Sequence, residues 1–296
     1  MNGPVFPPNP TPGQVFCGWM WNGTQWICLS GGQAVVQQVF TVSGSYIPSP
    51  GLVSLMVECV GGGGGGGGAV GQLVGPPAST DGWMMSGGGG AGGCYSRSVL
   101  AGAVVLGGAI VTVGAGGLAG VAAQGALGGQ GGTTSFGALV TAPGGNGGAA
   151  GTFIAGVFSP GGGGGRNVLG IGQLAVYGSG GEHGQSIMFD GGVGQVILWG
   201  GMGGGSHFQS GGVAALQSPT GGVGATGFFG AGGGGGASVY ASGPALGGAG
   251  GNGLVLITEY CLGFGDGPRS DCGCGAQGQA RIAVDAGWQG HGGWNG

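Results

Sequence analysis

The sequence predicts an all-β protein: an antiparallel β-sandwich joined to glycine helices of the polyglycine II type and preceded by a small β-hairpin. Glycine accounts for 92 of the 296 residues, whereas about 7% is usual. Hydrophobic residues make up 41% of the chain and charged residues 4%, the reverse of the balance typical of disordered chains. No segment carries the apolar repeat of an amphipathic α-helix. We therefore expect the glycines to be packed.

Residues 1–32 are predicted to form a separate arm that contains the hairpin. Asn22-Gly23 lies between two aromatic runs and is a strong signal for a two-residue turn. In the register that this turn sets, the facing pairs are Trp21 and Thr24, Trp19 and Trp26, and Cys17 and Cys28. The register predicts a Cys17–Cys28 disulfide; the alternative is that both cysteines are small, half-buried apolar residues.

The tryptophans of this hairpin indicate an attachment role. Trp19, Trp21 and Trp26 lie close together in the sequence, and an isolated two-stranded hairpin is marginally stable in water. A larger body or a partner subunit must therefore cover them. We predict that the hairpin docks onto another protein.

Residues 33–260 are predicted to form the main domain. Apolar and β-branched enrichment predicts strands at Val35–Val42, Leu52–Val60, Cys94–Leu100, Ala109–Val113, Thr133–Thr141 and Leu254–Tyr260. Turns are expected through Ser43-Gly44 and Pro48–Gly51. Cys59 and Cys94 fall inside strand-like segments, where we expect buried, small apolar residues.

Glycine runs separate these strands, beginning with eight consecutive glycines after Val60. A polyglycine II helix is extended, with three residues per turn and no internal hydrogen bonds, so its buried N–H and C=O groups need partners on neighbouring helices. The runs lack the sustained Gly-X-Y period of collagen. We expect a bundle of parallel and antiparallel helices built from Gly61–Gly68, Gly87–Gly93, Gly161–Gly165, Gly200–Gly205, Gly232–Gly236 and Gly247–Gly253. The alternative is flexible loops between strands.

Residues 261–296 are expected to form a C-terminal extension that caps or cross-links. Three of the seven cysteines lie here, namely Cys261, Cys272 and Cys274. We expect disulfides within the chain or to another chain, and the odd total leaves at least one thiol free or intermolecular. A thiolate-rich metal site that includes His291 is an alternative, but Cys272-Gly273-Cys274 lacks the usual spacing of paired zinc ligands.

The order of the blocks resembles a known family. "VFTVSGSYIPSPGLVSLMVECV" is followed by a glycine run, then by "GGTTSFGALVTAPGGNGG", and finally by "GAGGGGGASVYASGPALGGAGGNGLVLITEY". This series resembles the glycine-rich domain of tail-fibre and other virion proteins of tailed bacteriophages, over roughly residues 37–260. "GQVFCGWMWNGTQWICL" is similar to short tryptophan-containing modules of phage fibre proteins that bind other virion parts. Seven cysteines and the segment beyond Cys261 depart from the family pattern.

The resemblance implies a virion location, other virion proteins as partners, and a homotrimer, as is common among fibres and spikes. The glycine-rich ectodomain of certain animal receptor kinases is similar in packing, but the expected signal and membrane-spanning segments are not recognisable here. We expect no membrane insertion, because no apolar run approaches the roughly 20 residues that a span needs. No nucleic acid is expected either, since the net charge is −4 and the chain has no Lys.

We expect no enzyme activity, no cofactor and no metal. Glu182 precedes His183, but adjacent residues of an extended segment point to opposite faces. Motifs of the GxGxxG type arise by chance in so glycine-rich a chain. Catalytic residues are therefore predicted to be absent.

Surface recognition is the remaining chemistry. Exposed apolar loops could contact a glycan or protein of a host surface through Trp83, Met84, Phe228, Phe229 and Tyr240; alternatively, these side chains seal the layers of the fold. The leading hypothesis is a virion structural protein, a component of a fibre, spike or decoration. The second is a receptor-binding adhesin, and a distant third is an ice-binding protein, for which no regular threonine- or alanine-rich face is visible.

Overall fold

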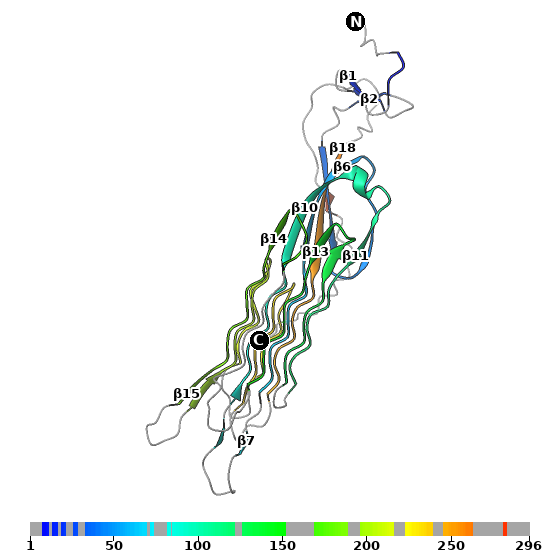
Figure 1. Cartoon of the computed structure of the whole chain (residues 1–296). Coiled ribbons are helices and arrows are strands. Elements are labelled where there is room, and N and C mark those ends of the chain that lie inside the picture. Colours follow the sequence, from blue (N-terminus) through cyan, green and yellow to red (C-terminus); the bar gives the residue numbers. More distant parts are fainter. Residues whose placement is uncertain are drawn as a thin grey trace, which may run out of the picture.

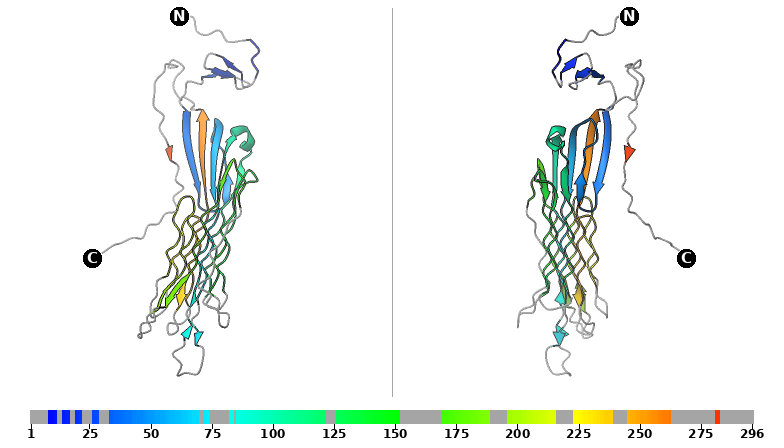
Figure 2. Two further views of the ribbon diagram at one scale, coloured as in Figure 1. Left: turned by 60° about the vertical axis from the view of Figure 1, so that its left-hand side comes forward. Right: turned by 90° about the vertical axis from the view of Figure 1, so that its right-hand side faces the viewer.

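In a computed structural model, the protein is an elongated body with a β-sandwich towards one end and extended glycine-rich segments towards the other (Figures 1 and 2). The structure describes residues 8–11, 14–16, 19–21, 26–28, 33–69, 72–73, 82–83, 85–121, 126–151, 169–188, 196–215, 223–238, 245–262 and 281–282. Among these residues the one helical element is a 3₁₀ turn, η1 (Gly102–Val105), and the remainder consists of strands, extended segments and turns. The predicted all-β class is confirmed.

Two antiparallel sheets form the sandwich. The larger sheet has the order β14-β10-β6-β18-β4-β19, comprising β14 (Leu174–Val176), β10 (Tyr95–Ala101), β6 (Leu52–Val60), β18 (Leu254–Leu262), β4 (Gln33–Phe40) and β19 (Arg281–Ile282). The short strand β19 departs from this pattern and pairs parallel, along the edge of β4. The smaller sheet has the order β13-β12-β11-β5, comprising β13 (Val140–Ala142), β12 (Thr134–Phe136), β11 (Ala109–Thr112) and β5 (Gly44–Tyr46).

The remaining strands form small separate sheets. At the N-terminus, β1 (Val15–Phe16), β2 (Trp19–Trp21) and β3 (Trp26–Cys28) make a three-stranded sheet. Beyond the glycine segments, the pairs are β7 (Gln72–Leu73) with β8 (Gly82–Trp83), β9 (Met85–Ser86) with β17 (Ala237–Ser238), and β15 (Gln185–Met188) with β16 (Val196–Trp199).

A side-chain core fills the space between the two large sheets. Its fully buried members come from both sheets and from η1, and are Tyr46, Leu55, Val57, Cys59, Val105, Val111, Phe136, Val140, Ala142, Val255 and Ile257. The rings of Tyr46 and Phe136 meet edge to face with centroids 5.3 Å apart. The strands alternate inward and outward residues, as an antiparallel sandwich requires.

Most strand predictions agree with the structure within two residues, and β6 has the predicted bounds. The predicted strand Thr133–Thr141 is divided into β12 and β13, because Gly137 adopts a positive φ of 52° and turns the chain. β5 was not predicted: it begins at Gly44, inside the first expected turn, and its three residues pair with β11.

The predicted register of the N-terminal hairpin is wrong. The structure pairs Trp21 with Trp26, and Trp19 with Cys28. Four residues, 22–25, therefore separate the paired tryptophans, and Cys28 no longer faces position 17. Hairpin connections longer than two residues are common, so the Asn22-Gly23 pair did not fix the register. Cys17 itself lies outside the described residues.

Polyglycine II helices continue from the sandwich strands into a bundle. Residues 61–69 form its central helix, and their N–H groups donate in rotation to three antiparallel neighbours. Gly61, Gly64 and Gly67 donate to Cys94, Ala91 and Gly88; Gly62, Gly65 and Gly68 to Gly132, Gly129 and Ala126; and Gly63, Gly66 and Ala69 to Gly251, Gly248 and Ala245. These bonds span 2.8–3.3 Å. The three-residue repeat is that of polyglycine II.

The carbonyl groups of the central helix accept from three further neighbours, which run parallel to it. Gly117 and Gly120 donate to Gly63 and Gly66; Gly145 and Gly148 to Gly62 and Gly65; and Gly233 and Gly236 to Gly64 and Gly67. The six neighbours bond to one another in a closed ring, in the order 87–93, 143–149, 126–132, 114–121, 245–251 and 230–236. The central helix is thus enclosed by hydrogen-bonded backbone on all sides.

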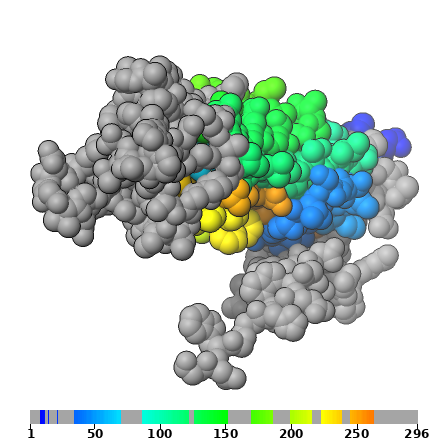
Figure 3. Space-filling view, turned by 90° about the horizontal axis from the view of Figure 1, so that it is seen from below, coloured from blue at the N-terminus to red at the C-terminus, as the bar shows by residue number. Residues whose placement is uncertain are grey.

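Residues 230–236 are the centre of a second ring. Their neighbours are residues 61–69, 87–93, 200–205, 211–215, 223–227 and 245–251, each joined by at least one backbone hydrogen bond. Seen from below in Figure 3, the yellow and orange surface of the helices at 223–251 adjoins the green surface of the first ring. The two fused rings make a small hexagonal array.

Backbone packing leaves no room for a side chain at several interior positions of this array. A Cβ atom on Gly64 would lie 2.0 Å from the carbonyl oxygen of Asn146, and one on Gly66 would lie 2.0 Å from that of Gly234. Real Cβ atoms do not approach so closely, so these positions accept only glycine. The predicted bundle of parallel and antiparallel glycine helices is confirmed, except that Gly161–Gly165 lies outside the described residues.

Candidate interaction surfaces

Two of the predicted contact residues, Phe228 and Phe229, lie at the junction of sandwich and bundle. The chain reverses there: Ala231 donates to the Phe228 carbonyl over 2.9 Å, while Phe229 and Gly230 adopt positive φ of 41° and 79°. A Cβ atom on Gly230 would meet Val60 at the end of β6. The two rings are 64% and 49% exposed. Together with Thr41 and the 250–253 segment they line a shallow hollow of about 290 Å³.

Trp83 lies at the opposite end of the molecule. It belongs to β8, which pairs with β7 beyond the end of the bundle (Figure 1). Close by, Gly67 donates to Gly88, and β9 pairs with β17. Met84 and Tyr240, the other predicted contact residues, lie outside the described part of the chain. The structure therefore separates Trp83 from the phenylalanine pair with which it was grouped as a predicted contact.

The far end is where the bundle helices reverse. The described parts of these helices stop here at residues 69 and 87, 121 and 126, 215 and 223, and 238 and 245, as their hydrogen bonds within the array require. The β15–β16 hairpin continues two outer helices there, with Gln185 facing Trp199. Several described helix ends thus lie at the end farthest from the N-terminal sheet.

An aromatic cluster covers the outer face of the larger sheet beside the junction. The Tyr95 hydroxyl donates to Glu58 Oε1 over 2.5 Å. Its ring stacks on His207 with centroids 3.9 Å apart, and Phe208 meets both rings edge on. Burial raises the pKa of Tyr95 above its usual value, as does the Glu58 carboxylate, while Arg97 lowers it in part. The contacts anchor the 206–210 turn to the sandwich.

A buried carboxylate joins the two sheets at the other end of the sandwich. Glu259 is fully buried, and it accepts from the Tyr46 hydroxyl over 2.5 Å and from the Ser49 amide over 3.1 Å. Ser49 Oγ donates to the second carboxylate oxygen. Burial raises the pKa of Tyr46, and the Glu259 carboxylate raises it further. Because these groups are enclosed, they serve the fold rather than a solvent-facing reaction.

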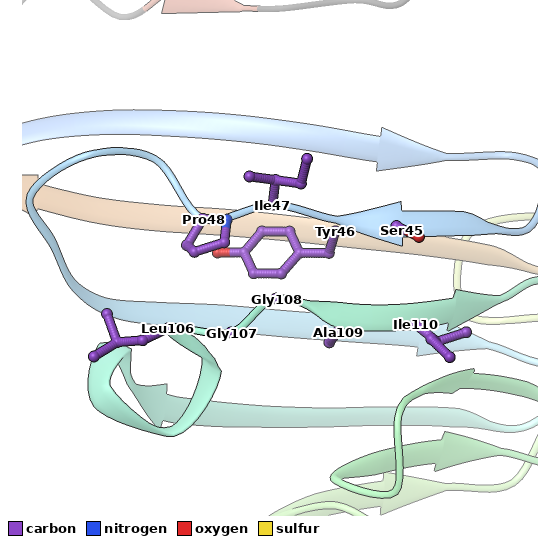
Figure 4. A pocket seen from close by; sticks show the side chains of 9 residues that line it. All are labelled: Ser45, Tyr46, Ile47, Pro48, Leu106, Gly107, Gly108, Ala109 and Ile110. Carbon is purple, nitrogen blue, oxygen red and sulfur yellow. The ribbon is translucent and has the colours of Figure 1, made fainter.

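A pocket of about 540 Å³ lies where β5 meets the start of β11 and the turn before it (Figure 4). Its wall combines Tyr46, Ile47 and Pro48 with Leu106 and Ile110. The lining contains no charged residue, and Ile47, Leu106 and Ile110 are 75%, 68% and 71% exposed. The pocket is open to solvent, and the hydroxyl of Tyr46, the one titratable residue in its lining, is held by the buried Glu259.

Three cysteines of the sandwich are buried. Cys59 and Cys94 are enclosed, as predicted. Cys261, which we expected in a disulfide, is a free thiol on the inner side of β18 and is 4% exposed. Burial raises the pKa of Cys59 to about 12, and it raises the pKa values of Cys94 and Cys261 as well. Cys28 lies in β3, whereas Cys272 and Cys274 lie outside the described residues.

The other titratable residues are dispersed. Glu182 and His183 are both exposed on the outer helix at 177–184. Within the described residues, no three of His, Cys, Asp and Glu lie close enough together to hold a metal ion. Over the same residues, no helix is long and apolar enough to cross a membrane.

The outer helices carry a sequence signal beyond the glycine runs from which the bundle was predicted. In "GAGGLAGV", residues 114–121, glycine recurs at 114, 117 and 120, and these three are buried, whereas Leu118 is 78% exposed and Val121 60%. A period of three is expected when only one side of a polyglycine II helix faces the bundle. The same pattern could have identified the outer helices at 126–132 and 223–227.

Comparison with known proteins yields one family. The family model of a glycine-rich domain matches residues 40–285. The match begins at the last residue of β4 and reaches just past β19, so it spans the bundle, the added edge strand and the sandwich strands that follow β4. A search of curated proteins found no match.

Proposed function

The chain thus belongs to the glycine-rich domain family, and on this premise we propose that it is a bacteriophage virion structural protein, forming the rigid body of a fibre, spike or decoration. The double-ring array of glycine helices is the observation that carries the proposal. Between the sandwich and the far end, backbone hydrogen bonds join eleven neighbouring segments of the described chain. Ten of them form the two rings, and the eleventh, 177–184, bonds to 200–205. Such an array resists bending and local opening.

The arrangement along the long axis suits a component that bridges two sites. The N-terminal sheet lies at the sandwich end, and the helix reversals lie at the opposite end (Figure 2). We propose that the N-terminal hairpin attaches to other virion proteins and that the protein works as a homotrimer in the extracellular particle. Disulfides through Cys17, Cys28, Cys272 or Cys274 are proposed to fasten the subunits. No catalytic activity or cofactor is part of this proposal.

Purified particles test this function. The protein should be detected by mass spectrometry in the particle, should resist protease there, and should be absent from particles assembled without residues 1–32. Peptide mapping under reducing and non-reducing conditions would then locate the disulfides. A protein found only in the lysate, and never in the particle, would contradict the virion role.

A receptor-binding role at the tip is the second candidate, and a specific observation favours it. The helix reversals and Trp83 gather at the end farthest from the N-terminal sheet. The isolated protein should then bind purified host surface polysaccharide or protein, and Trp83→Ala should weaken binding at least tenfold. Phe228→Ala, at the junction, is the matched control and should bind normally. Binding to other virion proteins alone would exclude the adhesin role.

A further inference from the structure

Six neighbouring outer helices of the bundle each expose one large apolar side chain near the far end. In order around the bundle, these side chains are Leu127, Val121, Leu246, Val223, Val213 and Met202, and each is between 44% and 68% exposed. Backbone hydrogen bonds join each helix to the next, from 126–132 through 114–121, 245–251, 223–227 and 211–215 to 200–205. We call these six side chains the apolar belt.

The members of the apolar belt lie at nearly the same height along the bundle. The residues directly before Val121, Leu127 and Leu246 bond to Gly66, Gly68 and Ala69, at the end of the central helix. The other three helices are bonded in step with these, through the residue pairs 224 and 246, 225 and 213, and 203 and 212. Because polyglycine II rises about 3.1 Å per residue, the belt occupies about one turn of helix.

The outward side chains become smaller or more polar towards the sandwich. Three and six residues from the belt on the same helices, the outward positions are Gln130 and Thr133, Leu118 and Ala115, Ala249 and Asn252, and Thr226. Leu118 is the one large apolar residue among them. Large apolar side chains left open to water indicate an interaction site, and here they gather at the far end.

The charges near the belt favour an uncharged partner. Within the described helices of the bundle, Glu182 is the one Asp, Glu, Lys or Arg, and it lies on helix 177–184, outside the belt. The described arginines, Arg97 and Arg281, belong to strands of the sandwich. An anionic surface attracts a protein through Lys and Arg, so it would gain nothing from the described residues of this end. The belt therefore suits a partner that is apolar and carries no net charge.

The shape of the belt favours a lipid surface over a protein. A protein that docks from one side would cover two or three neighbouring helices and leave the rest of the belt in water. A bilayer surface into which the far end dips would meet all six helices at one depth. Trp199, the last residue of β16, and Trp83 of β8 lie at the same end, where β7 and β15 are labelled in Figure 1. Tryptophan is enriched where proteins cross the boundary between lipid and water.

The backbone limits the depth of this contact. The outward side of a polyglycine II helix has a solvated backbone, and backbone groups that need water do not enter the hydrocarbon core. Apolar residues that lie in a bilayer surface reach about 5–10 Å into the boundary between head groups and acyl chains. One turn of polyglycine II is about that long, so the height of the belt matches a shallow contact.

We propose that the apolar belt binds the surface of a zwitterionic lipid bilayer, with the far end in the head-group layer and the N-terminal sheet pointing away from it. The contact is interfacial and requires no membrane-spanning segment. It goes beyond the proposed virion role and does not depend on it, because it concerns surface residues of the isolated chain.

Flotation of the full-length protein with phosphatidylcholine vesicles in a density gradient tests this proposal. The double variant Val121→Glu with Leu127→Glu places two carboxylates in the belt. The matched control is Leu106→Glu with Ile110→Glu, because these side chains are 68% and 71% exposed on the sandwich. Circular dichroism spectra and melting curves establish that each variant is folded. If the belt variant does not fold, Val121→Ser with Leu127→Ser replaces it.

The wild type and the control should float with the vesicles, and the belt variant should bind at least about tenfold more weakly. Added phosphatidylglycerol or salt should change the affinity of the wild type by less than about twofold, because charge does not drive the contact.

Three results would overturn the proposal. The first is a wild type that does not float, or a belt variant that floats equally well. The second is binding that needs phosphatidylglycerol and is lost at high salt. The third is a wild type that ignores vesicles but has a mass above 27.6 kDa by light scattering, which falls to that value in the belt variant; the belt would then join copies of the chain.

Discussion

The sandwich and the glycine bundle are built from one chain but are stabilised in different ways. In the sandwich, strands bond along sheet ladders, and side chains such as Phe136 and Ile257 fill the space between layers. In the bundle, the first eight residues of the central helix have no side chain, and its backbone forms hydrogen bonds with six surrounding segments. The sandwich is stabilised by the packing of large apolar side chains, whereas the bundle can form only where side chains are absent.

This difference predicts opposite responses to the same kind of mutation. Removing atoms damages the sandwich, because a cavity forms where packing was tight. Adding atoms damages the bundle, because neighbouring backbones already occupy the space of a Cβ. The two regions meet at one peptide bond, between Val60, the last residue of β6, and Gly61.

The largest expected effect comes from adding one methyl group to the centre of the bundle. In Gly64→Ala the new Cβ would lie 2.0 Å from the Asn146 carbonyl oxygen. We expect a loss of at least about 5 kcal/mol in the free energy of unfolding, or failure to fold, since losses above about 4–5 kcal/mol are exceptional for point mutants. Denaturant unfolding measures it. Gly107→Ala is the matched control, because nothing lies within 4 Å of its Cβ position, and it should change stability by less than about 1 kcal/mol.

Removing a large side chain from the sandwich should have the next largest effect. Phe136 is fully buried against Tyr46. Phe136→Ala should lower the free energy of unfolding by about 3–5 kcal/mol, through lost burial and a cavity. Leu118→Ala truncates a side chain that is 78% exposed on an outer helix and should change it by less than about 0.5 kcal/mol. Similar losses for the two variants would contradict the assignment of the core.

Loss of one hydroxyl should have a smaller effect. Tyr46→Phe removes a donor to the fully buried Glu259. Leaving a buried carboxylate short of one partner should cost about 1–3 kcal/mol. Thermal unfolding measures it, and Tyr177→Phe, whose ring is 58% exposed, is the control. An unchanged melting temperature for Tyr46→Phe would show that Ser49 alone holds the carboxylate.

Alkaline pH should produce the mildest change. Burial raises the pKa of the Cys59 thiol from 9.0 to about 12, so the folded protein favours the neutral thiol. This stabilisation is complete below pH 9 and declines as pH rises towards 12, because the unfolded chain then loses the proton first. At pH 10 the loss should be about 1 kcal/mol. Cys59→Ala should reduce the slope of stability against pH between 9 and 10; an identical slope in the variant would exclude Cys59 as its source.

The sequence predicted those elements that a local pattern specifies, such as a run of apolar residues or a run of glycines. Leu52–Val60 is rich in apolar residues and ends at the glycine run, so its bounds were recognisable. The 61–68 run predicted a polyglycine II helix because no other ordered structure suits eight glycines. β5 could not be predicted in this way, since its three residues form a strand only because β11 lies beside them.

The long-range arrangement needed the structure. Nothing in the sequence around Phe228 distinguishes the junction from the far end, and the position follows only from Gly230 meeting Val60. The burial of Cys261 depends on the inward face of β18, a matter of register with β6 and β4. The hairpin register was missed because Asn22-Gly23 predicted a two-residue turn, whereas four residues separate the paired Trp21 and Trp26.

Amide hydrogen exchange of the glycine run tests the central claim most directly. If residues 62–68 are enclosed by hydrogen-bonded neighbours, their amides should exchange only through global unfolding and be as well protected as those of β6. Peptides covering 52–60 and 61–69 would then show the same slow exchange. Rapid exchange of 61–69 beside a protected β6 would mean that the glycines are open loops, and the enclosed bundle would be wrong.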